Sequence, residues 1–289
     1  MVLAVILSGI GPVLVRDSPV DPAATAFWRL FLGLPLALFL VRRSVMLPPR
    51  TMFWAALGGL LLSGDLMCWN RSLVTTTILE GTVLVMVYPV ITAVANYLIF
   101  RERITLRLAI GGGIAFLGLL MMVVQANDGG QSSVSGDLWA LGAACFYAFS
   151  LLISARLCRA HDTQVVSFWL IFWASVGAAP FGFIVDERSV PQTPHDWAYI
   201  VGYAAMTVAS YSLFNRGLKT VPTAVASLMG YGQPVVATVL GFFFLHEAPT
   251  VMNVLGSIVI VIGLILATRQ NRNGRRDRPS TGGMAEPVE

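Results

Sequence analysis

The chain has 289 residues, of which 56% are hydrophobic and only 12% are Asp, Glu, Lys or Arg, about half the charged fraction of an ordinary soluble domain. So little charge cannot cover a soluble protein of this size, and the net charge of +4 comes from basic residues in scattered short clusters. The composition excludes a cytosolic enzyme, a nucleic-acid-binding domain and a secreted disulfide scaffold, and it predicts a polytopic membrane protein.

Ten hydrophobic segments follow one another along the chain. Most approach the roughly 20 residues that a helix needs to cross a bilayer. They should be helices, because backbone polar groups cannot remain unpaired in lipid. The first segment lacks the basic start of a signal peptide, so we interpret it as a span. The predicted spans are 2–15, 22–41, 52–72, 77–100, 104–124, 138–158, 164–185, 197–217, 223–246 and 251–268.

The basic residues predict the orientation of these spans. If the N-terminus is cytoplasmic, fifteen Lys and Arg residues fall on the cytoplasmic side and three fall outside. Cytoplasmic loops carry such an excess, so both termini are expected in the cytoplasm. Residues 269–289 carry five arginines and end in Gly, Pro and Glu, which predicts a disordered cytoplasmic tail.

The chain repeats itself at a constant offset of 145 residues. The matching positions are Phe27-Trp28 and Phe172-Trp173, Pro35 and Pro180, Asn70-Arg71 and Asn215-Arg216, Pro89 and Pro234, Glu102 and Glu247, Gly111 and Gly256, and Gly118 and Gly263. Each repeat holds five spans, an odd number, so the second repeat should enter the membrane from the opposite side. The pattern predicts two inverted five-helix repeats, residues 1–124 and 137–268, with alternating access around a site near the bilayer midplane.

Several motifs in the two repeats resemble a known family. The segment from Tyr88-Pro89 through Arg101-Glu102 to Gly111 and Gly118 is similar to the fourth and fifth helices of an EamA-type unit, and Gln233-Pro234 through Glu247 to Gly263 is similar to its second copy. Arg29 resembles an arginine often found in the second helix, whereas Ser8-Gly9 stands where many relatives have Trp-Gly. The chain thus resembles the drug/metabolite transporter superfamily, EamA type, over about residues 2–268. The resemblance implies ten helices, an inner-membrane location and, usually, export of small metabolites such as amino acids.

Three ionisable residues, Arg29, Asp65 and Glu80, lie inside predicted spans. Burying such groups unpaired costs at least a few kcal/mol, so they are candidates for substrate binding or gating. Spacing from the span ends places all three in the outer half of the bilayer, where Arg29 and Asp65 could pair. A structural ion pair or an interfacial charge is the alternative. The second repeat has Ala174, Ser210 and Val225 at the matching positions, so charge is kept in one half only.

A second set of candidates consists of aromatic and amide side chains in mid-span, which prefer a polar cavity or a neighbouring helix to lipid. Tyr88 and Gln233 are repeat equivalents that directly precede the prolines, and they are the best pointer to the binding site. The alternative for each aromatic residue is simple packing or anchoring at the membrane interface. The set is Trp69, Tyr88, Tyr147, Tyr203, Tyr211 and Gln233.

Other residues carry predictions about shape. Pro89 and Pro234 should kink their helices, as hinges of the cavity or as fixed bends. Gly111-Gly112-Gly113 lacks the Lys-Ser/Thr of a phosphate-binding loop, so close helix packing is expected. Glu102 and Glu247 are expected to pair at the membrane edge or to act in gating, with substrate contact as the alternative.

The function that these patterns favour is a secondary transporter that exports small amino-acid-like metabolites across the inner membrane. Transport of a vitamin, a metallophore or a nucleotide-like compound is the alternative, and an integral membrane enzyme or a channel is a remote one. The expected partners are a small-molecule substrate and the lipid bilayer. Asp65 and Glu80 could also couple protons. The sequence contains no motif for nucleotide, metal, cofactor or nucleic-acid binding and no sign of an ATPase subunit, so none of these partners is expected.

Overall fold

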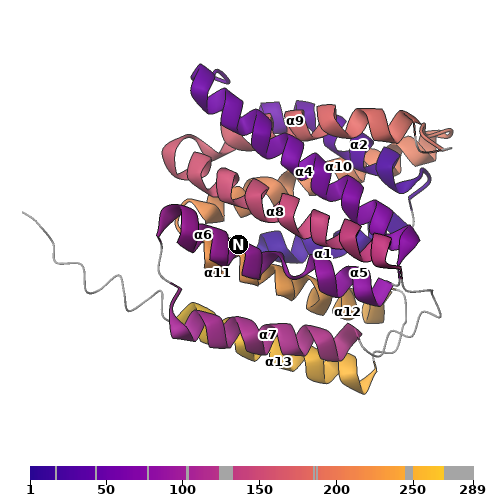
Figure 1. Ribbon diagram of the computed structural model, residues 1–289. Helices are drawn as coiled ribbons and strands as arrows, with labels where there is room; N and C mark the ends of the chain where they lie inside the picture. The colour runs from indigo at the N-terminus through magenta and orange to yellow at the C-terminus, as the bar shows by residue number, and fades with distance from the viewer. Residues whose placement is uncertain are drawn as a thin grey trace, which may run out of the picture.

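The computed structural model describes residues 1–16, 18–42, 44–76, 78–101, 104–123, 133–184, 186, 188–244 and 250–269. Within these residues all regular structure is helical, which confirms the predicted all-α fold class (Figure 1). The helices are α1 (Val2–Arg16), α2 (Pro22–Phe31), α3 (Leu34–Phe39), α4 (Pro49–Thr75), α5 (Ile78–Val85), α6 (Tyr88–Phe100), α7 (Leu106–Val123), α8 (Val134–Ala160), α9 (Thr163–Ile184), α10 (Pro194–Leu218), α11 (Thr223–Leu228), the 3-10 helix η1 (Met229–Tyr231), α12 (Gly232–Phe244) and α13 (Val251–Arg269).

The bundle is built of long rods, each a single helix or two consecutive helices that continue in the same direction. Three of these rods are interrupted, each just before a proline. The breaks separate α2 from α3, α5 from α6, and α11 from α12, and they precede Pro35, Pro89 and Pro234. Proline cannot donate the backbone hydrogen bond that would join the two parts into one regular helix. Pro180, the repeat equivalent of Pro35, lies inside the continuous helix α9. Seven helices or joined pairs are long and apolar enough to cross a bilayer among the described residues, and α1 is a shorter apolar helix.

The rods run back and forth between two ends of the bundle, so that chain neighbours are antiparallel (Figure 1). We call the end where the chain begins the Met1 end, and the end where α10 begins the Pro194 end. At the Met1 end, the indole of Trp169 donates to the carbonyl of Val45 at 2.8 Å. At the Pro194 end, the indole of Trp28 donates to the carbonyl of Ser189 at 2.7 Å. Both ends therefore carry hydrogen bonds between the two halves of the chain.

Helix packing follows the internal repeat. Helix α2 packs against its equivalent α9, and α7 packs against its equivalent α13. Likewise, α4 packs against α8 and α9, while the equivalent helix α10 packs against α1 and α2. In the repeat, α4 corresponds to α10, α8 to α1, and α9 to α2. Each contact made by α4 therefore has an equivalent made by α10, as expected for two halves related by a pseudo-two-fold axis.

The contact between α7 and α13 is unusually close. A Cβ atom on Gly111 would lie 2.7 Å from the carbonyl oxygen of Gly263, and one on Gly118 would lie 2.7 Å from that of Gly256. The two glycine pairs are repeat equivalents of each other. Gly112 faces a side chain of α11, and Gly113 has nothing within 4 Å of its Cβ position. Gly111 and Gly118 therefore serve close backbone packing, as the small residues predicted.

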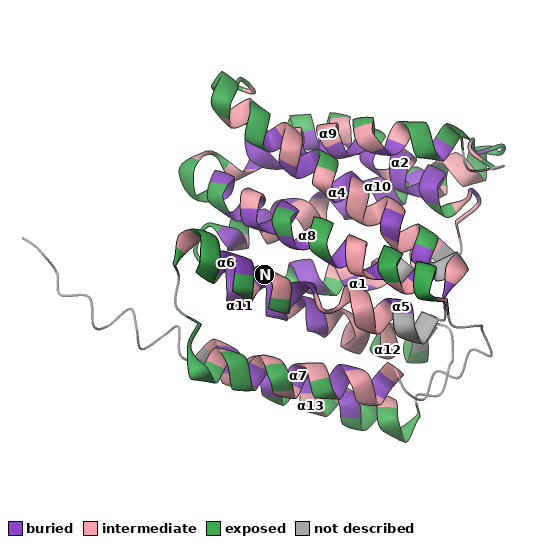
Figure 2. Ribbon diagram, viewed as in Figure 1, coloured by how far each residue is buried: buried purple, intermediate pink, exposed green. Residues whose placement is uncertain are grey.

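Many large apolar residues are exposed on the outside of the bundle, where Figure 2 colours the exposed positions green. Phe39 is 82% exposed and Leu98 is 70% exposed, although both belong to strongly apolar helices. Soluble proteins rarely leave such a continuous apolar surface in water, so this surface is suited to lipid. Small side chains such as Ala140, Ala144 and Ala148 are fully buried where α8 crosses its neighbours.

A capping box begins α10 at the Pro194 end. The carboxylate of Asp196 accepts the backbone N–H groups of Thr193 at 3.0 Å and Gln192 at 3.1 Å, while the Thr193 hydroxyl accepts the N–H of Asp196 at 3.2 Å. These bonds satisfy donors that a helix start leaves unpaired. Hydrogen bonds from Thr193, led by its backbone N–H, lower the pKa of the Asp196 carboxyl below its ordinary value.

Acid is expected to weaken this cap. Because the fold favours the ionised Asp196, its stabilising contribution is present above the ordinary pKa of about 3.9 and is lost as pH falls through the lowered pKa. Asp196→Asn cannot ionise and should lack this part of the acid dependence. Thermal unfolding of the purified protein in detergent, between about pH 6 and pH 3, should show a steeper loss for the wild type. Parallel curves would contradict the expectation.

Candidate functional site

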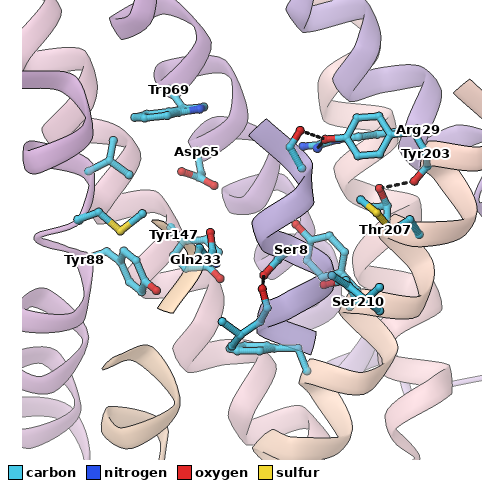
Figure 3. Close-up of a pocket in the computed structure, with 18 residues that line it drawn as sticks. Ser8, Arg29, Asp65, Trp69, Tyr88, Tyr147, Tyr203, Thr207, Ser210 and Gln233 are labelled. Atoms are coloured by element: carbon cyan, nitrogen blue, oxygen red, sulfur yellow. Dashed lines mark hydrogen bonds between the residues drawn. The ribbon is translucent and has the colours of Figure 1, made fainter. Parts of the chain in front are cut away.

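One cavity of about 250 Å³ lies inside the bundle, with walls from α1, α2, α4, the α5–α6 junction, α8, α10 and α12 (Figure 3). It collects residues from both halves of the chain. Of the nine side chains proposed for substrate binding or gating, eight line it: Arg29, Asp65, Trp69, Tyr88, Tyr147, Tyr203, Tyr211 and Gln233. The ninth, Glu80, lies in α5, and its side chain is outside the described part of the structure.

Arg29 supplies the positive charge of the cavity. Its guanidinium donates a hydrogen bond to the hydroxyl of Tyr203 and lies over the Tyr203 ring, 5.1 Å from the ring centroid. Its Nε atom is buried without a hydrogen-bond partner. The Tyr203 hydroxyl in turn donates to the carbonyl of Gly11 at 3.3 Å. Arg29 is thus held in place on one side and keeps donor capacity for a further acceptor.

Asp65 supplies an acidic side chain from the neighbouring helix α4. Its side chain points into the space between Trp69, Tyr147 and Gln233 (Figure 3). The ion pair with Arg29 that the sequence allowed is not formed, because the guanidinium turns to Tyr203 instead. Asp65 accepts no hydrogen bond from the described residues. The cavity therefore presents a guanidinium and a carboxyl group that make no direct contact with each other.

Aromatic rings form much of the remaining wall. Tyr88 and Tyr147 meet edge to face, with ring centroids 4.6 Å apart and planes at 90°. Trp69 and Tyr211 line the same cavity from α4 and α10. Such rings offer apolar surface to a ligand together with polar edges and faces that attract cations.

Three pairs of repeat equivalents line the cavity together: Asp65 with Ser210, Trp69 with Phe214, and Tyr88 with Gln233. Each pair takes one residue from either half. The cavity therefore lies across the pseudo-two-fold relation, where inverted-repeat transporters place their sites. The pair of Asp65 and Ser210 also shows that charge at this place is a property of the first half alone.

The α1 wall was missed by reasoning from sequence. Val5, Ser8 and Gly11 line the cavity, and the main-chain carbonyl of Gly11 accepts the hydrogen bond from the Tyr203 hydroxyl. The available signal was the spacing of the two small residues, Ser8 and Gly11, at one helical turn on an otherwise apolar span. Glu102 and Glu247 lie outside the described residues, so their expected pairing stays a prediction.

The arrangement suits reversible binding more than covalent chemistry. An anionic group can reach the Arg29 guanidinium, a cationic group can reach Asp65 and the aromatic faces, and an apolar body fits between them. Among the described residues, no three His, Cys, Asp or Glu side chains gather as ligands for a metal ion.

The helical architecture and the apolar surface define a multi-pass membrane protein, and it encloses a cavity lined by polar and aromatic side chains. A family model described as the EamA-like transporter family matches residues 1–124 and 134–269. The chain belongs to the EamA-like transporter family, and the resemblance seen in its sequence is confirmed.

Several known proteins are similar to the chain along most of its length. An uncharacterized transporter of Archaeoglobus fulgidus is 23% identical over 271 residues, which cover 93% of this chain and 95% of that protein. The uncharacterized transporter YwfM of Bacillus subtilis is 25% identical over 258 residues, which cover 87% of this chain and 86% of that protein. The pseudopaline exporter CntI of Pseudomonas aeruginosa is 22% identical and covers 87% and 88%. One crystal structure shares the fold, with a TM-score of 0.78, 20% identity and coverage of 93% of this chain and 95% of that one.

Proposed function

We propose that the protein is a secondary transporter that exports small amino-acid-like metabolites across the inner membrane. The observation that carries the proposal is the cavity in which Arg29 and Asp65 face one solute-sized space without contacting each other. An amino-acid-like compound offers a carboxylate to the first and an ammonium group to the second, with a side chain for the aromatic wall. Unpaired charges inside a bilayer are costly, and binding such a solute compensates both at once.

Alternating access between two inverted five-helix halves is the mechanism we propose. The five rods of the first half, within residues 1–124, and the five of the second, within residues 137–268, cross the bilayer ten times in this scheme. Both termini and the tail from residue 269 lie in the cytoplasm, as the excess of basic residues at the Met1 end supports. The packing of equivalent helices and the three equivalent pairs that line the cavity support exchange between the halves. Pro89 and Pro234 are the proposed hinges, because each follows a break in its helix.

A metallophore is the second candidate substrate. The relative from Pseudomonas aeruginosa is named as an exporter of pseudopaline, and its similarity extends over most of this chain. That name also supports export as the direction of transport. Within the described part of the chain, the carboxylate of Asp65 is the one that faces the cavity, so it is the group we propose for any coupling to protons.

Reconstitution in liposomes tests this function. Purified protein in vesicles loaded with a panel of labelled amino acids should release zwitterionic members with saturable kinetics, whereas protein-free vesicles should not. An imposed pH gradient should change the rate or the extent of accumulation if Asp65 carries a proton. Release that rises linearly with concentration for every compound would contradict a carrier, and unaltered behaviour under a pH gradient would exclude proton coupling.

A further inference from the structure

On the side of the cavity towards the Met1 end, a specific contact joins the two halves. The hydroxyl of Tyr88, at the start of α6, donates to the main-chain carbonyl of Ser227 in α11 at 3.0 Å. Tyr88 is only 4% exposed, and α6 packs along α11 here. The hydroxyl lies against Gly230, where a Cβ atom would overlap it. The halves thus meet here through a tyrosine that packs against a glycine.

The repeat defines the matching place at the Pro194 end. The equivalents of Tyr88, Ser227 and Gly230 are Gln233, Thr82 and Val85. Here the halves are apart: within the described residues, α5 and α12 have no packing comparable to that of α6 and α11. Gln233 and Val85 line the cavity instead, and Gln233 makes no hydrogen bond to a described side chain or carbonyl. The contact between the halves is therefore present on one side of the cavity, and its repeat equivalent is not formed between the described residues on the other.

The substitutions between the two places compensate each other. A glutamine amide reaches less far than a tyrosine hydroxyl, but it also carries an N–H donor. Where the contact is formed, the longer tyrosine meets glycine; at the equivalent place, the shorter glutamine is matched in the repeat by valine, and both line the cavity. The added bulk of Val85 would fill the space that the shorter Gln233 leaves. Each place thus has a donor of the length that its opposing residue requires.

We propose that Tyr88 with the Ser227 carbonyl and Gln233 with the Thr82 carbonyl are two alternating gates of the cavity. When α6 leaves α11, α5 closes on α12 and the Gln233 amide donates to the carbonyl of Thr82. Tyr88 and Gln233 then act by setting which end is open, beyond any contact they make with the substrate. This inference rests on the proposed alternating access and assigns residues to its two states.

Spin-label distances in substrate-free protein test the assignment. One pair of labels spans each end, placed at exposed residues after the native cysteines have been replaced by serine. The label sites are Leu98 with Lys219 at the Met1 end and Arg71 with Phe243 at the Pro194 end; the replaced residues are Cys68, Cys145 and Cys158. Wild-type protein should show two distance populations at each end, one for each state.

The two gate variants should shift these populations in opposite directions. Tyr88→Phe keeps the ring but loses the hydrogen bond, and it should raise the fraction open at the Met1 end. Gln233→Leu should raise the fraction open at the Pro194 end. Each shift should be about threefold in the ratio of states, as expected for one hydrogen bond in a membrane protein. Tyr97→Phe, also on α6 but with a 51% exposed side chain, is the matched control and should shift nothing.

Gly230→Ala provides a second test of the same gate. The added methyl group would overlap the Tyr88 hydroxyl, so it should open the Met1 end at least as much as Tyr88→Phe does. In the Tyr88→Phe background its effect should shrink, because the overlapping oxygen is gone.

The outcomes separate this inference from the function on which it rests. Two populations that move in opposite directions in the two variants support the gates. Two populations that shift the same way, or do not shift, overturn the gates and leave the transporter intact. A single unchanging distance at both ends, in every variant, overturns alternating access and the gates with it.

Discussion

Arg29→Ala is expected to lower transport of an amino-acid-like substrate by roughly 10- to 100-fold at low concentration, because a hydrogen bond to a charged group contributes about 1.5–3 kcal/mol. The guanidinium faces the cavity, is held by the Tyr203 hydroxyl and ring, and keeps its buried Nε atom free for a ligand. Arg29→Lys keeps the charge but loses the planar fork, so it should recover only part of the activity.

Substrate analogues that lack either the carboxylate or the amino group can test which substrate group each side chain binds. The decarboxylated amine of a good substrate has nothing to offer Arg29, so Arg29→Ala should reduce its transport much less than that of the parent zwitterion. Asp65→Asn should show the reverse preference and spare the analogue that lacks the amino group. Arg50→Ala, at an exposed position at the start of α4, is the control and should transport like the wild type. Normal transport by both Arg29→Ala and Asp65→Asn, in well-expressed protein, would contradict the assignment of these two residues to substrate binding.

Gly111→Ala is expected to destabilise the protein by about 1–3 kcal/mol, which is the typical cost of forcing extra volume into a packed contact. The new Cβ atom would lie 2.7 Å from both the backbone nitrogen of Ala267 and the carbonyl oxygen of Gly263, and backbone cannot turn aside as a side chain can. Helices α7 and α13 would have to separate. Gly118→Ala should have a similar cost for the same reason, since its Cβ would meet the backbone of Gly256 and Ile260.

The control for this prediction lies on the same helix. Gly113 has nothing within 4 Å of its Cβ position, so Gly113→Ala should be neutral or should stabilise by up to about 1 kcal/mol through better helix propensity. Unfolding of the purified variants in detergent micelles would measure the difference. Equal stability of Gly111→Ala and Gly113→Ala would show that the close contact is absent from the folded protein.

Much of the architecture could be predicted because membrane burial leaves strong signals in sequence. The continuous apolar runs indicated helices, and the constant offset of the repeat indicated two related halves. The interruptions were harder: prolines at 35, 89 and 180 look alike in sequence, yet α2 and α3 are separate, as are α5 and α6, while α9 is continuous through Pro180. Whether a proline breaks a helix depends on what its neighbours pack against, which a single sequence does not contain.

The candidate site was predicted in composition but not in its contacts. Charged and aromatic residues in mid-span are costly in lipid, so their gathering in one cavity followed from Arg29, Asp65 and the tyrosines. Their partners did not follow. Depth along the span allowed Arg29 to meet Asp65, whereas rotation about the helix axes, set by packing, brings it to Tyr203. Ser8 and Gly11 were overlooked because small residues on an apolar helix serve lipid-facing, packed and cavity positions alike.

The seam between α7 and α13 has a mechanical consequence. Gly111 rests on Gly263 as Gly118 rests on Gly256, and swapping the halves converts the first contact into the second. The α7–α13 contact is symmetric under this exchange, so it has the same geometry before and after the two halves exchange conformations. This contact can therefore persist while the two proposed gates open in turn. The α7–α13 pair would then stay fixed during transport, and the other helices would move relative to it.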